Sequence, residues 1–178
     1  MARVVVPGIC CIVLAAALTV VPPLTGQQAK ETAAVAPVPA QIAAARKVFI
    51  SNGGADVLAQ SVFKRAGEPD QAYNHFYFAM QSWGRYELVS APADADLVFE
   101  IRFAAPVYYN GTLTSFQPQF GLSIVDAKSH FLLWSLTEPV EGAFRKATWL
   151  KNFDHGLDNL MDDLKKLAPP ANDLPAKK

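Results

Sequence analysis

The sequence predicts an α+β domain, with a mainly antiparallel sheet of about 4–6 strands and two helices packed on one face. Three observations predict it. Residues 96–103 alternate between apolar and polar side chains, as expected of a strand with one face on a core. Asn110-Gly111 lies between two β-forming stretches, which is a strong short signal for a hairpin. Residues 152–168 carry apolar side chains at helical spacing, and Pro169 stops that helix.

The domain is predicted to begin with a strand and a helix. Residues 47–50 form a short apolar strand closed by turn residues 51–54, while 55–66 fit either a weak helix or a loop. A helix begins at Glu68-Pro69-Asp70, because proline suits the first turn and acids suit the positive end of the helix dipole. It ends at Gly84, a C-cap residue. Its apolar stripe comprises Ala72, Phe76, Met80 and Trp83.

The rest of the domain is predicted to consist of strands joined by tight turns, followed by the last helix. The strands are 85–89, 96–103, the two arms around Asn110-Gly111, one marked by Phe120, Leu122 and Ile124, and 131–136. The turns are 92–94 and 126–129. The element order is therefore β-α-β-β-hairpin-β-β-α. Because most connections are hairpins, the sheet is predicted to be mainly antiparallel.

The N-terminus reads as a secretory signal. Arg3 provides a positive start, residues 9–21 are apolar or small apart from Thr19, and Pro22-Pro23 ends any helix. The alternative is an uncleaved membrane anchor over residues 4–24, nearly long enough to span a bilayer. Both interpretations place the remainder outside the cytoplasm, periplasmic or secreted.

Four regions follow from this reading. Residues 1–26 are the signal segment, and 27–45 form an Ala/Pro-rich linker that lacks large apolar side chains to bury. Residues 46–168 are one α+β domain, and 169–178 are a solvated tail. Membrane contact is expected only through an uncleaved signal.

Cysteine and charge exclude several kinds of chemistry. Cys10 and Cys11 both lie inside the signal segment, so the exported chain has no disulfide, thiolate nucleophile or cysteine-bound metal. Ile9 precedes the first of them, which does not fit a lipidation site. Removal of residues 1–26 takes away Arg3 alone, leaving 15 basic and 16 acidic residues, so a nucleic-acid partner is not expected.

No catalytic motif is apparent. His75, His130 and His155 share no ligand spacing, so neither a metal nor another cofactor is predicted. Ser51 precedes a turn but lies in no nucleophile elbow. The paired acids Asp94/Asp96, Asp158/Asp162 and Asp162/Asp163 fit a turn and a solvated helix face. The domain is therefore predicted to be no enzyme.

The candidate binding surface is the stretch from Pro106 to Phe120. It places apolar and aromatic residues around a hairpin that should stand off the sheet, and such residues suit a binding surface. The alternative is that they fold back over an open sheet edge. The predicted binding residues are Tyr108, Tyr109, Leu113 and Phe116, with Phe120 at the end of the stretch.

Two motifs carry a resemblance to known proteins. These are the strand Ala93-Asp94-Ala95-Asp96-Leu97-Val98-Phe99-Glu100-Ile101 and the hairpin from Leu122 to Trp134 around Asp126 and Ser129. With Ser82 to Val89 before them, they resemble small exported envelope proteins of bacteria such as Acidobacteria over residues 46–168. More remotely, residues 85–168 are similar to the N-terminal domain of the Tol-Pal translocation protein and to curli-secretion lipoproteins. The resemblance implies a bacterial, periplasmic, non-enzymatic domain and transfers no site residue.

The sequence thus predicts a non-catalytic exported domain that binds an envelope protein or another envelope component. One alternative is a small secreted hydrolase or ligand-binding enzyme, which a pocket with a histidine in hydrogen-bond reach of an acid would favour. The other is an envelope protein anchored by residues 4–24.

Overall fold

The computed structural model describes residues 36–59, 61 and 70–168. The predicted signal segment, most of the predicted linker, Glu68-Pro69 and the predicted tail lie outside these residues. The described part belongs to one compact unit that begins at Ala36.

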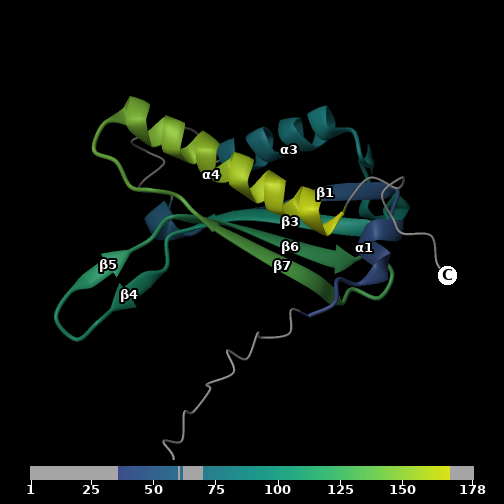
Figure 1. Ribbon diagram of the computed structural model, residues 1–178, viewed down its shortest axis with the longest axis horizontal. Coiled ribbons are helices and arrows are strands. Elements are labelled where there is room, and N and C mark those ends of the chain that lie inside the picture. Colours follow the sequence, from purple (N-terminus) through teal and green to yellow (C-terminus); the bar gives the residue numbers. More distant parts are fainter. Residues whose placement is uncertain (1–35, 60, 62–69, 169–178) are drawn as a thin grey trace, which may run out of the picture. The chain divides into compact units, whose positions relative to one another are not determined.

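The unit is built on a five-stranded sheet and a separate two-stranded hairpin (Figure 1). The sheet has the order β2-β1-β3-β6-β7. Its strands are β1 (Lys47–Ala55), β2 (Glu87–Leu88), β3 (Leu97–Ala104), β6 (Gln119–Asp126) and β7 (Leu132–Pro139). The predicted α+β class is confirmed, and five strands lie within the predicted range.

The sheet is mixed. The pairs β3–β6 and β6–β7 are antiparallel and joined by turns, as predicted. Strand β1 instead pairs in parallel with both β2 and β3. The reason is the helix that follows β1, because a crossover through a helix returns the chain in the direction in which it started.

Two helices cover one face of this sheet (Figure 1). They are α3 (Gln71–Trp83) and α4 (Lys146–Leu167). The predicted α3 stripe buries Ala72, Phe76 and Met80, and Gly84 caps the helix at φ 65°. Every apolar side chain at alternate positions of β3 is buried beneath the helices: Leu97, Phe99, Ile101 and Phe103.

An aromatic cluster joins α4 to the middle of the sheet. The ring centroids of Phe103 and Phe120 lie 5.1 Å apart, and those of Phe120 and Phe153 lie 4.8 Å apart. All three side chains are buried. Helix α4 begins at Lys146, earlier than the predicted start near Asn152, because Trp149 extends the buried stripe by one turn.

A short helix, α1 (Ala40–Ala44), lies within the stretch predicted to be a linker. Its Ile42 is fully buried, and the Ile42 carbonyl accepts a hydrogen bond from the Tyr86 hydroxyl at 3.1 Å. Burial raises the pKa of Tyr86 to about 12, although the positive charge of Arg85 opposes the shift. Arg85 also donates hydrogen bonds to the Ala43 and Ala45 carbonyls, so the folded domain begins before Arg46.

Strand β1 continues through residues 51–54, which were predicted to be a turn. Its pairing with β3 shifts register between Asn52 and Ala55, and Gly54 adopts φ 71° there. The Asn52 side chain donates a hydrogen bond to the Asp70 carboxylate at 2.8 Å. The Asp70 side chain thus binds a residue of β1 and forms no capping hydrogen bond with α3. The turn residues thus produce a bulge instead of ending the strand.

Candidate functional site

The candidate site is the hairpin of β4 (Val107–Tyr109) and β5 (Thr114–Phe116), which projects away from the main sheet (Figure 1). The two strands pair antiparallel with each other and form their own sheet. The Asn110 side-chain oxygen accepts hydrogen bonds from the N–H groups of Thr112 and Leu113, at 3.2 and 2.9 Å. Gly111 adopts φ 88°. Local turn chemistry therefore closes the hairpin, as Asn-Gly predicts.

The base of the hairpin is held to the domain by hydrogen bonds. The Gln117 N–H donates to the Pro106 carbonyl at 3.2 Å, and the Gln117 side chain donates to the Val140 carbonyl at 3.0 Å. On the other arm, Ala105 N–H donates to the Asp56 carboxylate at 2.7 Å. These contacts fix where the hairpin leaves the sheet, while the hydrogen bonds of its outer part to described residues are those of its own ladder and turn.

The predicted binding residues are exposed. The exposed fractions are 53% for Tyr108, 72% for Tyr109, 67% for Leu113 and 54% for Phe116. Val107, which the sequence reasoning did not single out, is exposed to 54%. The alternative drawn from the sequence was that these side chains fold back over an open sheet edge, whereas each of them is more than half exposed.

Phe120 differs from the rest of the predicted surface. It is fully buried in β6 and packs on Phe153, so the exposed surface ends before it. Its alternation with Leu122 and Ile124 was the signal that placed it in a strand of the core.

Cross-strand register sorts the exposed side chains onto two faces of the hairpin. Val107 lies opposite Phe116, and Tyr109 lies opposite Thr114. Because directly opposite residues share a face and successive residues alternate, Val107, Tyr109 and Phe116 lie on one face and Tyr108 on the other. The larger apolar face thus has three members, two of them aromatic.

The hairpin carries no charge. Residues 103–125 contain no Asp, Glu, Lys, Arg or His, whereas 18% of the whole chain is charged. This gap in the charge pattern is a sequence signal that could have marked the surface. A partner bound at an uncharged surface of tyrosine, phenylalanine, serine and threonine would be recognised by apolar contact and neutral hydrogen bonds, not by charge steering.

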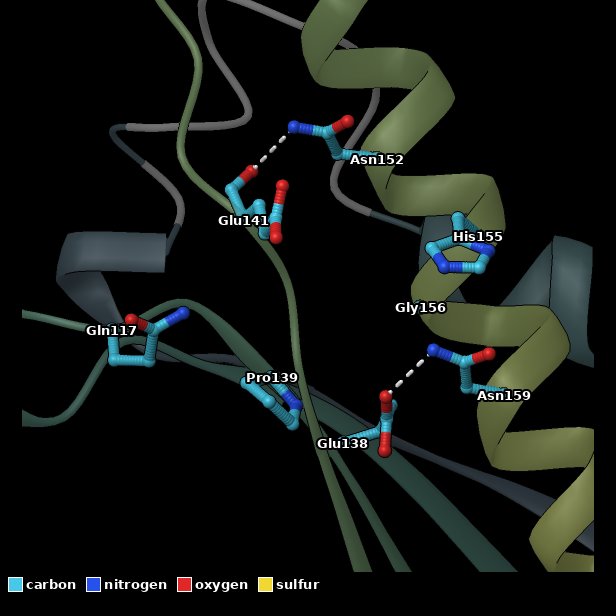
Figure 2. A pocket seen from close by; sticks show the side chains of 8 residues that line it. All are labelled: Gln117, Glu138, Pro139, Glu141, Asn152, His155, Gly156 and Asn159. Carbon is cyan, nitrogen blue, oxygen red and sulfur yellow. Dashed lines mark hydrogen bonds between the residues drawn. The ribbon is translucent and has the colours of Figure 1, made fainter.

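A second concave feature lies between α4 and the end of β7 (Figure 2). It has a volume of about 320 Å³, and its lining includes His155, Glu138 and Glu141. The Asn159 side chain donates to the Glu138 carboxylate at 2.9 Å, and Asn152 donates to the Glu141 carbonyl at 3.1 Å. Among the described residues, no hydrogen bond joins His155 to either acid. The cavity holds a histidine but not the histidine–acid pair that would favour a hydrolase.

The one histidine–acid contact between described residues lies elsewhere. His75 Nδ1 of α3 and Asp154 Oδ1 of α4 are 3.2 Å apart, and both side chains are about half exposed. The contact ties the two helices together at the surface. No group of three or more potential metal ligands occurs within residues 36–59, 61 and 70–168.

The chain was compared with known proteins. No family model matches it, and no curated protein matches it. Among solved structures, it is similar to a DUF330 protein of Xanthomonas campestris, with 16% identity and a TM-score of 0.47 over 73% of this chain and 87% of that one.

Two further structures show weaker likeness. The PelC dodecamer subunit of Paraburkholderia phytofirmans has 15% identity and a TM-score of 0.38, over 75% of this chain and 93% of that one. A Neisseria meningitidis lipoprotein has 14% identity and a TM-score of 0.27, over 66% of this chain and 99% of that one. At these identities and TM-scores no function is transferred to this chain. The predicted likeness to the Tol-Pal protein stays a prediction.

Within the described part of the chain, no helix combines the length and the apolar character that crossing a membrane requires. The predicted signal or anchor lies outside that part.

Proposed function

We propose that this chain is a non-catalytic exported envelope domain that binds a protein or another envelope component through the β4–β5 hairpin. The observation that carries the proposal is the exposure of five apolar side chains, by 53% to 72%, on an uncharged hairpin that projects from the sheet. Three of them, Val107, Tyr109 and Phe116, share one face of the hairpin, and an exposed apolar patch of this kind is typical of an interaction site.

Hairpin stability supports the same proposal. A lone two-stranded hairpin is marginally stable in water, because it has no hydrophobic face to bury. Here the ladder pairs only three residues on each side, from Val107↔Phe116 to Tyr109↔Thr114. A partner that covers the face of Val107, Tyr109 and Phe116 would supply the missing layer. Tyrosine suits this role, since it buries a large ring while its hydroxyl stays hydrogen-bonded.

The export part of the proposal rests on the sequence. Residues 9–21 and the following prolines fit a secretory signal, and the exported chain would lack cysteine. The partner is therefore sought in the periplasm or the cell envelope.

The test is crosslinking in cells, followed by capture of a C-terminally tagged chain from the envelope fraction and mass spectrometry. One variant changes Tyr108, Tyr109 and Phe116 to Ser. The matched control changes Phe78 and Phe144 to Ser, since these are also exposed apolar residues but lie outside the hairpin. We expect the hairpin variant to fold and to lose partners that the control retains.

Two results would contradict the proposal. If the hairpin variant unfolds, its aromatic residues support the fold and are not a free surface. If it folds and captures the same partners as the control, the hairpin is not the binding site. A monomeric chain that captures no partner would favour the alternative of a ligand-binding or enzymatic role, with the cavity beside His155 as the site to test.

A further inference from the structure

The sequence contains two Asn-Gly dipeptides, and the structure places them in different surroundings. Asn52-Gly53 lies in strand β1, and Asn110-Gly111 lies at the tip of the β4–β5 hairpin. All four residues are exposed. In such a dipeptide the backbone nitrogen of the glycine can reach the asparagine side chain with little hindrance, because glycine has no side chain of its own. Both dipeptides have the same chemistry available, so their surroundings decide where it proceeds.

The groups that would react at Asn52-Gly53 are held in place. The Asn52 side-chain nitrogen donates a hydrogen bond to the Asp70 carboxylate at 2.8 Å. A Cβ on Gly53 would lie 3.0 Å from Arg102 Cβ, so the Gly53 backbone is packed closely against β3. The glycine backbone therefore cannot turn toward the Asn52 side chain without disturbing the pairing of β1 with β3.

The corresponding groups at Asn110-Gly111 are free. Among the described residues, neither the Asn110 side-chain nitrogen nor the Gly111 N–H has a hydrogen-bond partner. Nothing lies within 4 Å of a Cβ added to Gly111. The Asn110 side-chain oxygen, in contrast, accepts the N–H groups of Thr112 and Leu113. Two donors on this oxygen stabilise the negative charge that develops there when the neighbouring carbon is attacked.

From this contrast we infer that Asn110 is a site of spontaneous deamidation in the folded chain, whereas Asn52 is protected. Hydroxide removes the Gly111 N–H proton, and the nitrogen then attacks Asn110 Cγ, which moves negative charge onto Oδ1. The Cγ–Nδ2 bond breaks next, and the side-chain nitrogen takes up a proton and leaves as ammonia. The product is a cyclic succinimide. Water opens this ring at either carbonyl, which leaves an aspartate or an isoaspartate at position 110.

Either product changes the hairpin. Residues 103–125 carry no charge, so the new carboxylate is the first charge in this stretch. Isoaspartate also adds a carbon atom to the backbone of the turn, which disturbs the register between Val107 and Phe116. The consequence for binding rests on the proposed function. An unpaired charge beside an apolar interface costs binding energy, so deamidation would weaken partner binding as the protein ages.

The experiment compares the two sites within one chain. The full chain is incubated folded and, in parallel, unfolded in guanidinium chloride, and tryptic peptides are followed over time by mass spectrometry. Cleavage separates the sites, because residues 48–64 contain Asn52 and residues 103–128 contain Asn110, each as the single asparagine. We expect folding to slow deamidation of Asn52 by about tenfold or more, and to leave Asn110 at least as fast as in the unfolded chain.

Two results would overturn the inference. One is that folding slows Asn110 as much as it slows Asn52, because the hairpin tip would then protect its asparagine. The other is that Asn52 deamidates in the folded chain as fast as Asn110, because the hydrogen bond to Asp70 and the packing of Gly53 would then have no effect.

The consequence for binding has its own test. Asn110→Asp reproduces the aspartate product, and capture of crosslinked partners should fall about tenfold. Asn74→Asp is the matched control, because it adds the same charge at an exposed position of α3, outside the hairpin, and should capture partners like the unchanged chain. Equal capture by both variants would overturn the consequence. The peptide measurement involves no partner, so failure of the hairpin proposal and failure of the deamidation inference are distinguishable.

Discussion

Gly156 of α4 faces Val140 so closely that a Cβ on the glycine would lie 2.9 Å from Val140 Cγ2. Val140 is fully buried and follows the last strand of the sheet. The same hypothetical Cβ would lie 3.4 Å from the Phe120 ring. The absence of a side chain at Gly156 thus sets how near α4 approaches the segment beside the cavity.

Gly156→Ala is expected to destabilise the domain. Overpacking costs about 1–3 kcal/mol, while the better helix propensity of alanine returns up to about 1 kcal/mol. Urea unfolding followed by circular dichroism measures the difference. Gly142→Ala is the control, because nothing lies within 4 Å of its added Cβ, and its effect should stay within about 0.5 kcal/mol. A Gly156→Ala variant as stable as the unchanged chain would show that α4 can move away from Val140 at no cost.

Phe120 and Tyr109 are expected to respond very differently to truncation. Phe120→Ala removes a buried ring from the aromatic cluster and should cost about 3–5 kcal/mol of the free energy of unfolding. Tyr109→Ala changes a side chain that is 72% exposed and should stay within about 0.5 kcal/mol. The same unfolding experiment measures both. A large loss in Tyr109→Ala would mean that the hairpin is packed against the domain in solution.

Asp96 is expected to make stability depend on pH. Its carboxylate accepts the N–H groups of Arg46 and Lys47 at 2.9 and 3.0 Å, and these hydrogen bonds lower its pKa from 3.8. Because the pKa is lower in the folded state, ionised Asp96 stabilises the fold. This contribution to stability is fully present above the unfolded-state pKa and is lost as pH falls through the folded-state pKa.

Asp96→Asn removes that charge and tests the effect. At neutral pH the variant should be less stable by roughly 1 kcal/mol, since hydrogen bonds to a carboxylate are stronger than those to an amide. The difference between the two proteins should shrink below pH ~4. Thermal unfolding at a series of pH values measures this difference. The pKa of Asp126 is also lowered, by hydrogen bonds from Ser129, but that effect is the same in both proteins and cancels when they are compared. A constant difference over the whole acid range would rule out this role for Asp96.

The elements that the sequence predicted well are those whose signals are local. The alternation from Leu97 to Phe103 identified a strand with one buried face, and Gly84 ended α3 where a left-handed residue was needed. The Asn110-Gly111 turn closes the hairpin that carries the predicted binding residues. Each signal involves residues within a few positions of one another, so it can be recognised in the sequence without knowledge of the fold.

The predictions that failed concern residues whose partners are distant in the chain. Ile42 was assigned to a linker because its neighbours are small, yet it docks beneath Tyr86. Helix α3 begins directly after Asp70, as expected, but the Asp70 side chain accepts a hydrogen bond from the distant Asn52, which was not predicted. No local pattern could reveal these contacts, since each depends on how two separate segments meet.

The sequence by itself determined where strands, turns and the amphipathic helix lie, because periodicity and turn chemistry act over a few residues. Only the tertiary structure decided the parallel pairing of β1 with β2 and β3, the burial of Phe120 beside an exposed Phe116, and the place of β7 at the end of the strand order. Strand order and exposure arise from contacts between distant segments, and these contacts exist only once the chain has folded.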